Sequence, residues 1–235
     1  ARPGAPLVTQ AYPAVARDEV ARIAAAHGAR LVLRDRDWWA EAGEAIHYRD
    51  AHGELTLPLP ALPGAHQTDN AALAVAMLRH QDRIAVTPEA MARGIRSARW
   101  PARLQRLGPG PLTALAPDRE VWLDGGHNPD AGAAIARHLA DRPRLHLIVG
   151  MLANKDPSAL VAPLAGRIRS IAVVPAPGHD AHPPEAFAAH TDQPVTSFAT
   201  VAHALRALPP EGDVLIAGSL YLAGEVLRLN EEIPD

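Results

Sequence analysis

The sequence has no cysteine, and this absence excludes several kinds of site. None of its 235 residues can form a disulfide, supply a thiolate nucleophile or bind zinc through sulfur. A chain without cysteine is also compatible with the cytoplasm, where we expect the protein to act. Lysine is nearly absent as well, because Lys155 is the only lysine among 23 basic residues. Because it is the only lysine, Lys155 is a candidate for a specific role.

Positive charge and long apolar runs are also limited. The formal net charge is −3, so the chain lacks the basic excess of nucleic-acid binders. No apolar run reaches the roughly 18 residues that suggest a membrane span. The first residues have no apolar segment of the kind found in signal peptides. We therefore expect that the protein binds neither nucleic acid nor a membrane. We also expect a globular protein that acts as a monomer.

Two glycine-rich nucleotide motifs are missing. No G-x-G-x-x-G follows a predicted strand, which argues against dinucleotide binding of the Rossmann type. No G-x-x-x-x-G-K-[ST] occurs, so the sequence has no recognisable loop for β- and γ-phosphates. The serine-elbow pattern G-x-S-x-G is absent too. The chain opens with an Arg-Pro-Gly turn rather than Met, and we interpret it as an internal fragment of a longer protein.

The apolar segments predict two α/β parts. Residues 1–98 are expected to form an α/β portion that lacks its own first half. Its predicted elements are strands at 5–10 and 30–34, two strands around a turn at Asp50–Gly53, and helices near 13–27, 66–80 and 87–99, the last with Thr87 as N-cap.

Residues 99–235 read as a complete small domain. Five apolar runs alternate with five helical patterns, an order typical of a parallel sheet with helices on both faces. We therefore predict a doubly wound, Rossmann-like fold. The expected strands are "VWLD", "LHLIVG", "SIAVV", "PVTSF" and "DVLIAG". Before them, "RLQRL" and "PLTALA" are expected to pair as a short hairpin.

The stretch "VWLDGGHNPDAG", residues 121–132, is the first candidate site. Asp124 closes a predicted parallel strand, and ligands of open α/β sheets bind outside the carboxyl ends of strands. The two glycines that follow permit close backbone approach and positive φ, and the next helix offers unpaired N–H groups to a phosphate. Asp124 could accept from ribose and His127 could donate to phosphate. The structural alternative is a capping loop, in which Asn128 caps the helix and His127 is simply exposed.

The stretch "PGAHQTDNAALAV", residues 63–75, is the second candidate. His66, Gln67 and Asn70 gather polar groups at the start of an apolar helix. Capping by Thr68 or His66 is the structural alternative, although the polar groups exceed what a cap needs.

A third stretch, "GHDAHPPE", contains His179 and His182. It lacks the H-E-x-x-H spacing that places two ligands on one helix face. We interpret this stretch as a solvated loop rather than a metal site.

Five motifs in order resemble one family. "HQTDNAALA" resembles the His-x-x-x-Asn helix start of the Mur ligase superfamily, and "WPARLQRL" resembles its W-P-G-R-L-[EQ] segment. "LDGGHNPDA", "IVGMLANKD" and "AGSLYLAGEVL" resemble the L-D-G-A-H-N-P, G-M-x-x-[DN]-K-D and G-S-L-[YH]-L-[VA]-G-x-[VI]-L motifs of folylpolyglutamate synthase and dihydrofolate synthase. Each motif is weak by itself, but together they are specific.

The resemblance implies a cytoplasmic ATP-dependent ligase of folate biosynthesis and one-carbon metabolism. Such enzymes place ATP and Mg²⁺ between a P-loop ATPase domain and a Rossmann-like domain. They phosphorylate a dihydropteroate or reduced folate carboxylate, which L-glutamate then attacks. On this basis residues 1–98 would be the C-terminal part of the ATPase domain and 99–235 the Mur ligase C-terminal domain. The sequence does not decide which folate ligase activity is present.

Four residues would bind ATP by this resemblance. Asn70 would contact adenine, and Arg103 would reach a phosphate. Asp124 would hold the ribose, and His127 would lie beside ribose or phosphate. Ala102 departs from the family, which usually has glycine before the arginine.

Four further residues follow from the same resemblance. Lys155 and Asp156 match the family's Lys-Asp pair and are catalytic candidates, while Ser219 and Tyr221 match the loop that lines the glutamate cleft. The P-loop and the metal ligands would lie upstream, so no metal ligand is assigned and this chain is expected to be inactive alone. The alternatives are a Mur ligase acting on a UDP-sugar peptide and a non-catalytic nucleotide-binding module.

Overall fold

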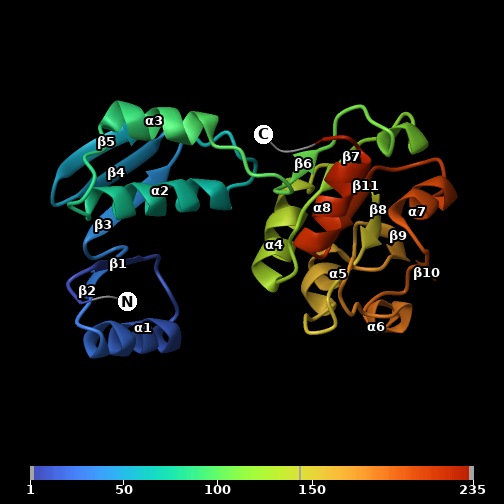
Figure 1. Ribbon diagram of the computed structural model, residues 1–235, viewed down its shortest axis with the longest axis horizontal. Coiled ribbons are helices and arrows are strands. Elements are labelled where there is room, and N and C mark those ends of the chain that lie inside the picture. The colour runs from blue at the N-terminus through green and yellow to red at the C-terminus, as the bar shows by residue number, and fades with distance from the viewer. Residues whose placement is uncertain (1–2, 143, 233–235) are drawn as a thin grey trace. The chain divides into compact units, whose positions relative to one another are not determined.

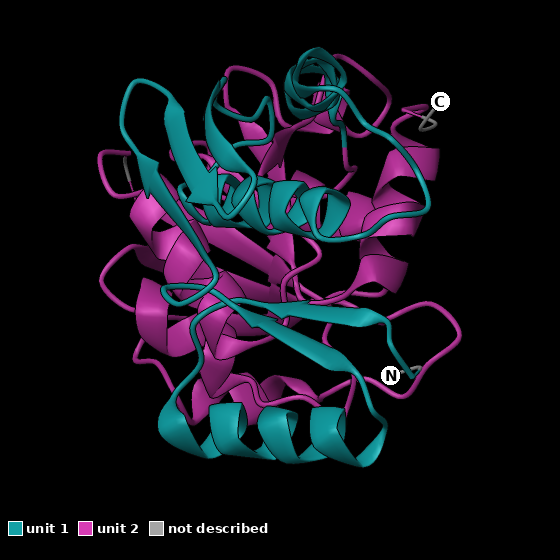
Figure 2. Ribbon diagram, turned by 90° about the vertical axis from the view of Figure 1, so that its left-hand side faces the viewer, with its two compact units in different colours: residues 1–99 teal, residues 100–235 magenta. Residues whose placement is uncertain are grey.

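The chain folds into two compact units, Ala1–Arg99 (unit 1) and Trp100–Asp235 (unit 2). Figure 1 shows the computed structural model, which describes residues 3–142 and 144–232, and Figure 2 colours the two units. Each unit contains its own cluster or clusters of buried apolar side chains.

Unit 1 begins with a β-α-β segment. Strand β1 (Pro6–Thr9) is followed by helix α1 (Ala14–Ala26) and strand β2 (Arg30–Leu33), and the two strands pair in parallel. Gly28, with φ of +60°, follows the C-cap residue His27, which is where a left-handed residue ends a helix. The predicted strands and helix are therefore confirmed here.

The rest of unit 1 is an antiparallel sheet with two helices. Strands β3 (Trp38–Ala42), β4 (Ile46–Asp50) and β5 (Gly53–Leu57) pair in sequence order. Helices α2 (His66–Arg79) and α3 (Pro88–Ser97) share a core with this sheet. Strand β3 was not predicted, because its short run mixes apolar and charged residues without a clear turn before it.

Unit 2 is built on a six-stranded sheet in the order β10-β9-β8-β11-β7-β6. Five strands run parallel, and only β6 is antiparallel to its neighbour β7. The strands are β6 (Gln105–Arg106), β7 (Val121–Leu123), β8 (Leu145–Val149), β9 (Ile168–Val173), β10 (Val195–Ser197) and β11 (Val214–Ala217).

Helices cover both faces of this sheet, as Figure 1 shows. One buried cluster joins α4, α5 and α6 to one face, and the other joins α7 and α8 to the opposite face. The fold class predicted from the sequence is confirmed. The helices are α4 (Pro129–His138), α5 (Ser158–Leu164), α6 (Pro184–Ala188), α7 (Val201–Ala207) and α8 (Leu220–Leu229), with a short 3₁₀ helix η1 (Thr113–Leu115).

The predicted hairpin of "RLQRL" and "PLTALA" is wrong. The first segment forms β6, which pairs with β7, and the second forms η1. Asn230, which is 1% exposed, accepts hydrogen bonds from the backbone N–H groups of Leu112 and Thr113 at 3.1 Å each. A side chain far along the sequence thus takes the backbone donors that a hairpin would have used.

Among the described residues, no helix combines the length and apolar character needed to cross a lipid bilayer.

Candidate functional site

The candidate site of unit 2 lies at the carboxyl ends of the parallel strands. Gly150 follows β8, and Gly218 follows β11 with φ of +114°. A Cβ on Gly218 would lie 2.9 Å from Val149 Cγ2, and one on Gly150 would lie 3.0 Å from the Val174 carbonyl oxygen. The backbone is therefore packed closely at this edge, where open α/β sheets bind ligands.

Asp124 joins two turns at this edge. One carboxylate oxygen accepts from the N–H of Leu104 at 2.8 Å, and the other accepts from the N–H of Gly126 at 2.6 Å. The Gly125 N–H also donates to the Ala102 carbonyl at 2.9 Å. Because Asp124 is only 6% exposed, its carboxylate serves first to hold these backbone segments together.

The turn held by Asp124 carries Arg103. Ala102 and Leu104 have φ of +55° and +47°, in the left-handed region that L residues adopt at a cost of about 1 kcal/mol. This conformation explains why a glycine suits position 102 and why alanine departs from that preference. The half-buried Arg103 places its Nη1 3.6 Å from where a Cβ on Gly125 would lie. The guanidinium group therefore sits beside the double glycine.

The two glycines act through their lack of a side chain. Neither Gly125 nor Gly126 has positive φ, so that part of the prediction is wrong. A Cβ on Gly126 would lie 2.6 Å from the Ala131 Cβ and 2.7 Å from Asp124 Oδ1, and one on Gly125 would collide with Leu220 Cδ2. The glycines thus let α8 and α4 approach the end of β7.

The structural alternative for the residues after the glycines is confirmed in part. Asn128 caps α4 by accepting from the Ala131 N–H at 2.9 Å, and Pro129 begins the helix. His127 is half-buried rather than simply exposed, and its Nδ1 lies 3.1 Å from the Gly125 carbonyl. A carbonyl oxygen can only accept, so Nδ1 carries the proton. Nε2 is then left as an acceptor when the imidazole is neutral and a donor when it is charged.

Ser219 and Tyr221 lie at the start of α8 but differ in access. Ser219 is the N-cap, with its Oγ accepting from the Leu222 N–H at 3.1 Å, and it is 2% exposed. Tyr221 is 52% exposed, and its ring centroid lies 3.7 Å from that of His179. Of the two, Tyr221 presents more surface to a small molecule.

Asp156 is exposed and lies two residues before the first residue of α5. Its carboxylate accepts from the Ser158 hydroxyl at 2.6 Å and from the Ser158 N–H at 2.9 Å. These two hydrogen bonds lower the pKa of Asp156, which makes it a weak proton acceptor. The neighbouring Lys155 is half-buried, and its carbonyl accepts from His182 Nε2 at 2.6 Å. The interpretation of His179 and His182 as part of a solvated loop missed the contact of His179 with Tyr221 and that of His182 with Lys155.

Asn70 belongs to unit 1, where it ends a chain of polar side chains on α2. The exposed Asn70 donates to Gln67 Oε1 at 3.1 Å, and Gln67 Nε2 lies 2.8 Å from His66 Nε2. No side chain caps α2, whose N-cap is Ala65, so capping by Thr68 or His66 is wrong. This leaves the polar cluster without a capping explanation.

The described residues hold no group of three or more His, Cys, Asp or Glu side chains that could bind a metal ion. On this observation, the part of the chain that the structure describes does not fit a complete metal site.

Comparison with known proteins gives three kinds of likeness. Residues 102–220 match the family described as Mur ligase, glutamate ligase domain. A folylpolyglutamate synthase from Lacticaseibacillus casei is 31% identical over 95% of this chain and 53% of its own length. A probable bifunctional folylpolyglutamate synthase/dihydropteroate synthase from Haloferax volcanii is 35% identical over 73% of this chain and 20% of its own.

A solved structure agrees with these relatives. The bifunctional folylpolyglutamate synthase/dihydrofolate synthase with Mn, AMPPNP and L-glutamate bound is 27% identical, with a TM-score of 0.77. The match covers 97% of this chain and 53% of that one. The chain thus spans about half the length of the L. casei relative and of this solved protein.

Proposed function

Since the chain belongs to the Mur ligase family, we propose that it is part of an ATP-dependent ligase that adds L-glutamate to dihydropteroate or to a folate. The curated relatives named as folylpolyglutamate synthases support the folate branch over a ligase acting on a UDP-sugar peptide. The observation within the chain that carries the proposal is the arrangement of Arg103 and Asp124 at the carboxyl edge of the sheet.

In this proposal the edge of unit 2 binds the phosphates and ribose of ATP. Arg103 pairs with a phosphate, because a guanidinium group binds phosphate oxygens in a forked geometry. The N-terminus of α4 adds a favourable dipole for the same negative charge. His127 lies beside these groups, and Asp124 would accept from a ribose hydroxyl in addition to the backbone N–H groups of Leu104 and Gly126 that it already holds. For unit 1, the family resemblance alone supports a contact of the Asn70 amide with adenine.

The chemistry follows from the weakness of a carboxylate as an electrophile. A carboxylate oxygen of the pteroate or folate attacks the γ-phosphorus of ATP, and ADP leaves. The amino group of L-glutamate then attacks the carbon of the acyl phosphate, loses a proton, and phosphate leaves as the amide forms. Arg103 would stabilise the charge of the phosphoryl group during transfer. Lys155 and Tyr221 would hold glutamate, while Asp156 would only shape the start of α5.

Mg²⁺ neutralises phosphate charge in enzymes of this kind, but no step is assigned to it in this chain. The described residues provide no metal cluster, and the sequence contains no G-x-x-x-x-G-K-[ST] loop. We therefore propose that the P-loop and metal ligands are supplied from outside this chain. The chain alone should bind nucleotide weakly and should not release ADP when given ATP, pteroate substrate and L-glutamate.

The test is calorimetric titration of the purified chain with ATP. Arg103→Ala should raise the Kd for ATP by about tenfold or more, as expected for a lost charged hydrogen bond. Arg106→Ala is the control, since Arg106 also carries positive charge nearby but its side chain is 62% exposed and pairs with Glu120. Equal affinities for the parent chain and Arg103→Ala would remove the proposed phosphate site.

A further inference from the structure

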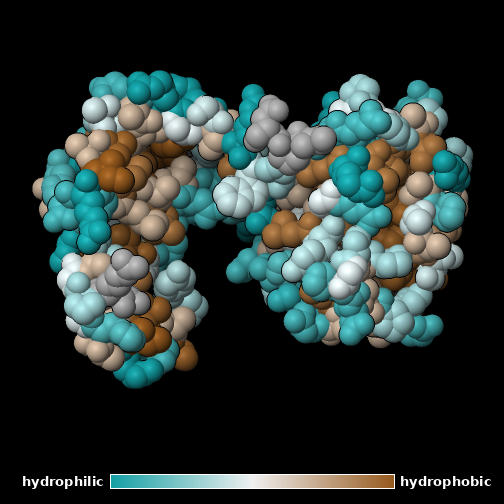
Figure 3. Space-filling view, viewed as in Figure 1, coloured by the Kyte–Doolittle hydropathy of each residue, from teal (hydrophilic) through white to brown (hydrophobic). Residues whose placement is uncertain are grey.

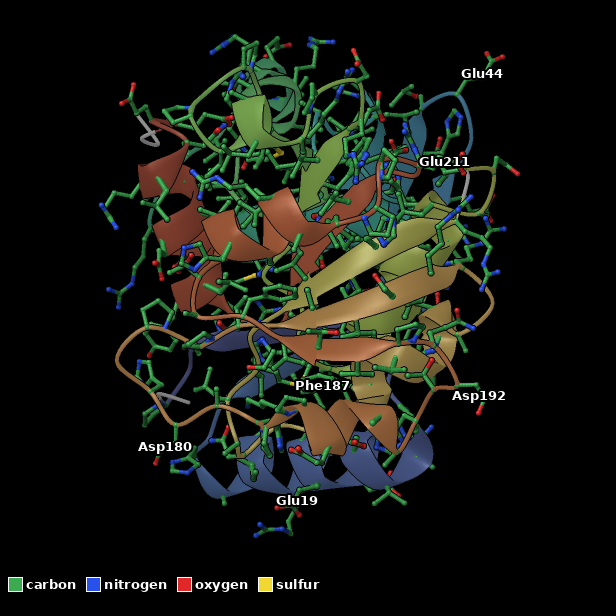
Figure 4. All side chains as sticks on the ribbon, turned by 90° about the vertical axis from the view of Figure 1, so that its right-hand side faces the viewer. Glu19, Glu44, Asp180, Phe187, Asp192 and Glu211 are labelled. Carbon is green, nitrogen blue, oxygen red and sulfur yellow. The ribbon has the colours of Figure 1, made fainter. Side chains whose placement is uncertain are left out.

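The segment 176–182, here called the strap, connects two motifs that are separate in the sequence. It lies between β9 and α6, and Figure 4 labels Asp180 within it and Phe187 on α6. Asp180 accepts through its carbonyl from the Ala153 N–H at 3.0 Å, and the His182 N–H donates to the Met151 carbonyl at 2.9 Å. Between these bonds, Leu152 and Ala181 form an antiparallel bridge. The strap is thus joined by backbone pairing to the "GMLANKD" motif.

The His182 side chain adds a hydrogen bond to Lys155, the only lysine of the sequence. Its Nε2 lies 2.6 Å from the Lys155 carbonyl oxygen. Because that oxygen can only accept, Nε2 must donate, in the neutral and the charged imidazole alike. The imidazole also meets the fully buried Phe187 ring edge-on, with centroids 6.1 Å apart. His182 is therefore oriented by a packed ring on one side and fixes the Lys155 peptide on the other.

The same strap reaches the start of α8. Gly178, with φ of +71°, lies within a turn that is closed by the His179 N–H donating to the Ala176 carbonyl at 3.1 Å. The His179 ring lies 3.7 Å, centroid to centroid, from the ring of Tyr221 at a tilt of 41°. This contact covers one side of a tyrosine that is otherwise about half exposed.

We propose that His182 and His179 are positioning residues for the glutamate-binding residues, with His182 fixing the Lys155 peptide and His179 fixing the ring of Tyr221. The ammonium group of Lys155 suits one carboxylate, and the phenol of Tyr221 can donate to the other. Neither histidine needs to touch the substrate, because each acts through the residue it holds. The inference rests on the proposed function for the identity of the amino acid, but the strap itself does not.

The lone lysine provides a direct test in the absence of any ligand. Isotopically labelled lysine gives the chain a single backbone amide signal, from Lys155. His182→Ala should move this signal, whereas His182→Gln, which keeps an N–H donor, should return it toward its parent position. His203→Ala is the matched control, because His203 is an exposed histidine of α7 in the same unit. A Lys155 signal that is unchanged in a folded His182→Ala variant overturns the strap.

Titration with L-glutamate then tests the substrate class. The Lys155 signal should respond in the parent chain, and half-saturation in His182→Ala should need about fivefold more glutamate, the worth of one neutral hydrogen bond. His179→Ala should have a similar effect through Tyr221. Equal half-saturation in parent and variants overturns the positioning role. No response in the parent would count against glutamate as the substrate, while the ligand-free spectra still decide whether the strap holds Lys155.

Discussion

The two units bury their apolar surface in different ways. Unit 2 covers both faces of its parallel sheet, and its exposed large apolar residues, Leu220 and Tyr221 among them, lie mainly at the candidate site. Unit 1 pairs β1 with β2 alone, although parallel strands are usually buried on both faces. Figure 3 shows apolar residues on its surface, where Tyr12, Val15, Ile23, Leu59, Met77, Leu78 and Ile84 are exposed. Apolar burial therefore contributes less to the stability of unit 1.

Unit 1 relies on a buried ion pair for part of its stability. Arg79 donates to both oxygens of Asp50, at 2.7 and 2.9 Å, and the Tyr48 hydroxyl donates at 2.9 Å. The Asp50 side chain is 0% exposed. Burial alone would raise the pKa of Asp50, but the hydrogen bonds from Arg79, the His52 N–H and Tyr48 outweigh it, so the pKa lies below its usual value. These bonds join the end of α2 to the β4–β5 hairpin.

The largest expected effect is the loss of this ion pair. Asp50→Asn leaves Arg79 buried without its partner charge, which should destabilise unit 1 by about 3–5 kcal/mol. Urea unfolding followed by the fluorescence of Trp38, after replacement of Trp39, Trp100 and Trp122 by phenylalanine, measures the change. Trp38 suits this purpose because it is fully buried in the core of unit 1.

The matched control for Asp50→Asn is another ion pair of unit 1. Glu19 and Arg22 pair at 2.7 Å on the surface of α1, with side chains 53% and 67% exposed. Glu19→Ala should therefore leave the urea midpoint of unit 1 nearly unchanged. If Asp50→Asn and Glu19→Ala had the same stability, the buried ion pair would not contribute to the stability of unit 1.

The second prediction applies one substitution to helical glycines of both units. In α4, a Cβ on Gly132 would collide with the Ala159 carbonyl oxygen, so Gly132→Ala should destabilise unit 2 by about 1–3 kcal/mol. In α3, nothing lies within 4 Å of a Cβ on Gly94, so Gly94→Ala should stabilise unit 1 by about 0.5–1 kcal/mol.

Thermal unfolding of the two glycine variants decides between these signs. Gly224→Ala in α8 serves as the control within unit 2, because a Cβ there also meets nothing within 4 Å. Destabilisation by Gly132→Ala alone would show that the tight helix contact of unit 2, rather than glycine itself, sets the result. A stabilising Gly132→Ala would mean that α4 and α5 are not packed as closely as the structure has them.

The smallest expected effect is a loss of stability in both units as the pH falls. Burial lowers the pKa of His146 in unit 2 and of His80 in unit 1 below the ordinary value of 6.5. The unfolded chain then binds protons more readily, so stability is complete above pH 6.5 and falls as the pH drops from 6.5 toward the folded pKa values. Urea midpoints at a series of pH values measure the loss. His146→Gln should reduce the pH dependence of unit 2 without abolishing it, because burial also lowers the pKa of His138 there, and an unchanged slope would contradict the assignment.

Features that depend on neighbouring residues could be predicted from the sequence. Thr87 and Asn128 cap their helices as expected, because a cap bonds a backbone N–H three residues away. The alternation of strands and helices after residue 120 also survives, because each period reflects one buried face. The residues proposed for ATP were identified by resemblance to a family, and their contacts were not part of that prediction.

Features that depend on distant residues could not be predicted. The sequence by itself determined the elements of unit 2 after residue 120 and their order, because hydrophobic period and capping act within a few residues. Only the tertiary structure decided that Asp124 holds the turn of Arg103 and that His182 holds Lys155. The partners in these bonds lie 20 and 27 positions apart along the chain. Nothing in the local pattern reports such a pair, since its geometry exists only once the sheet brings the strand ends together.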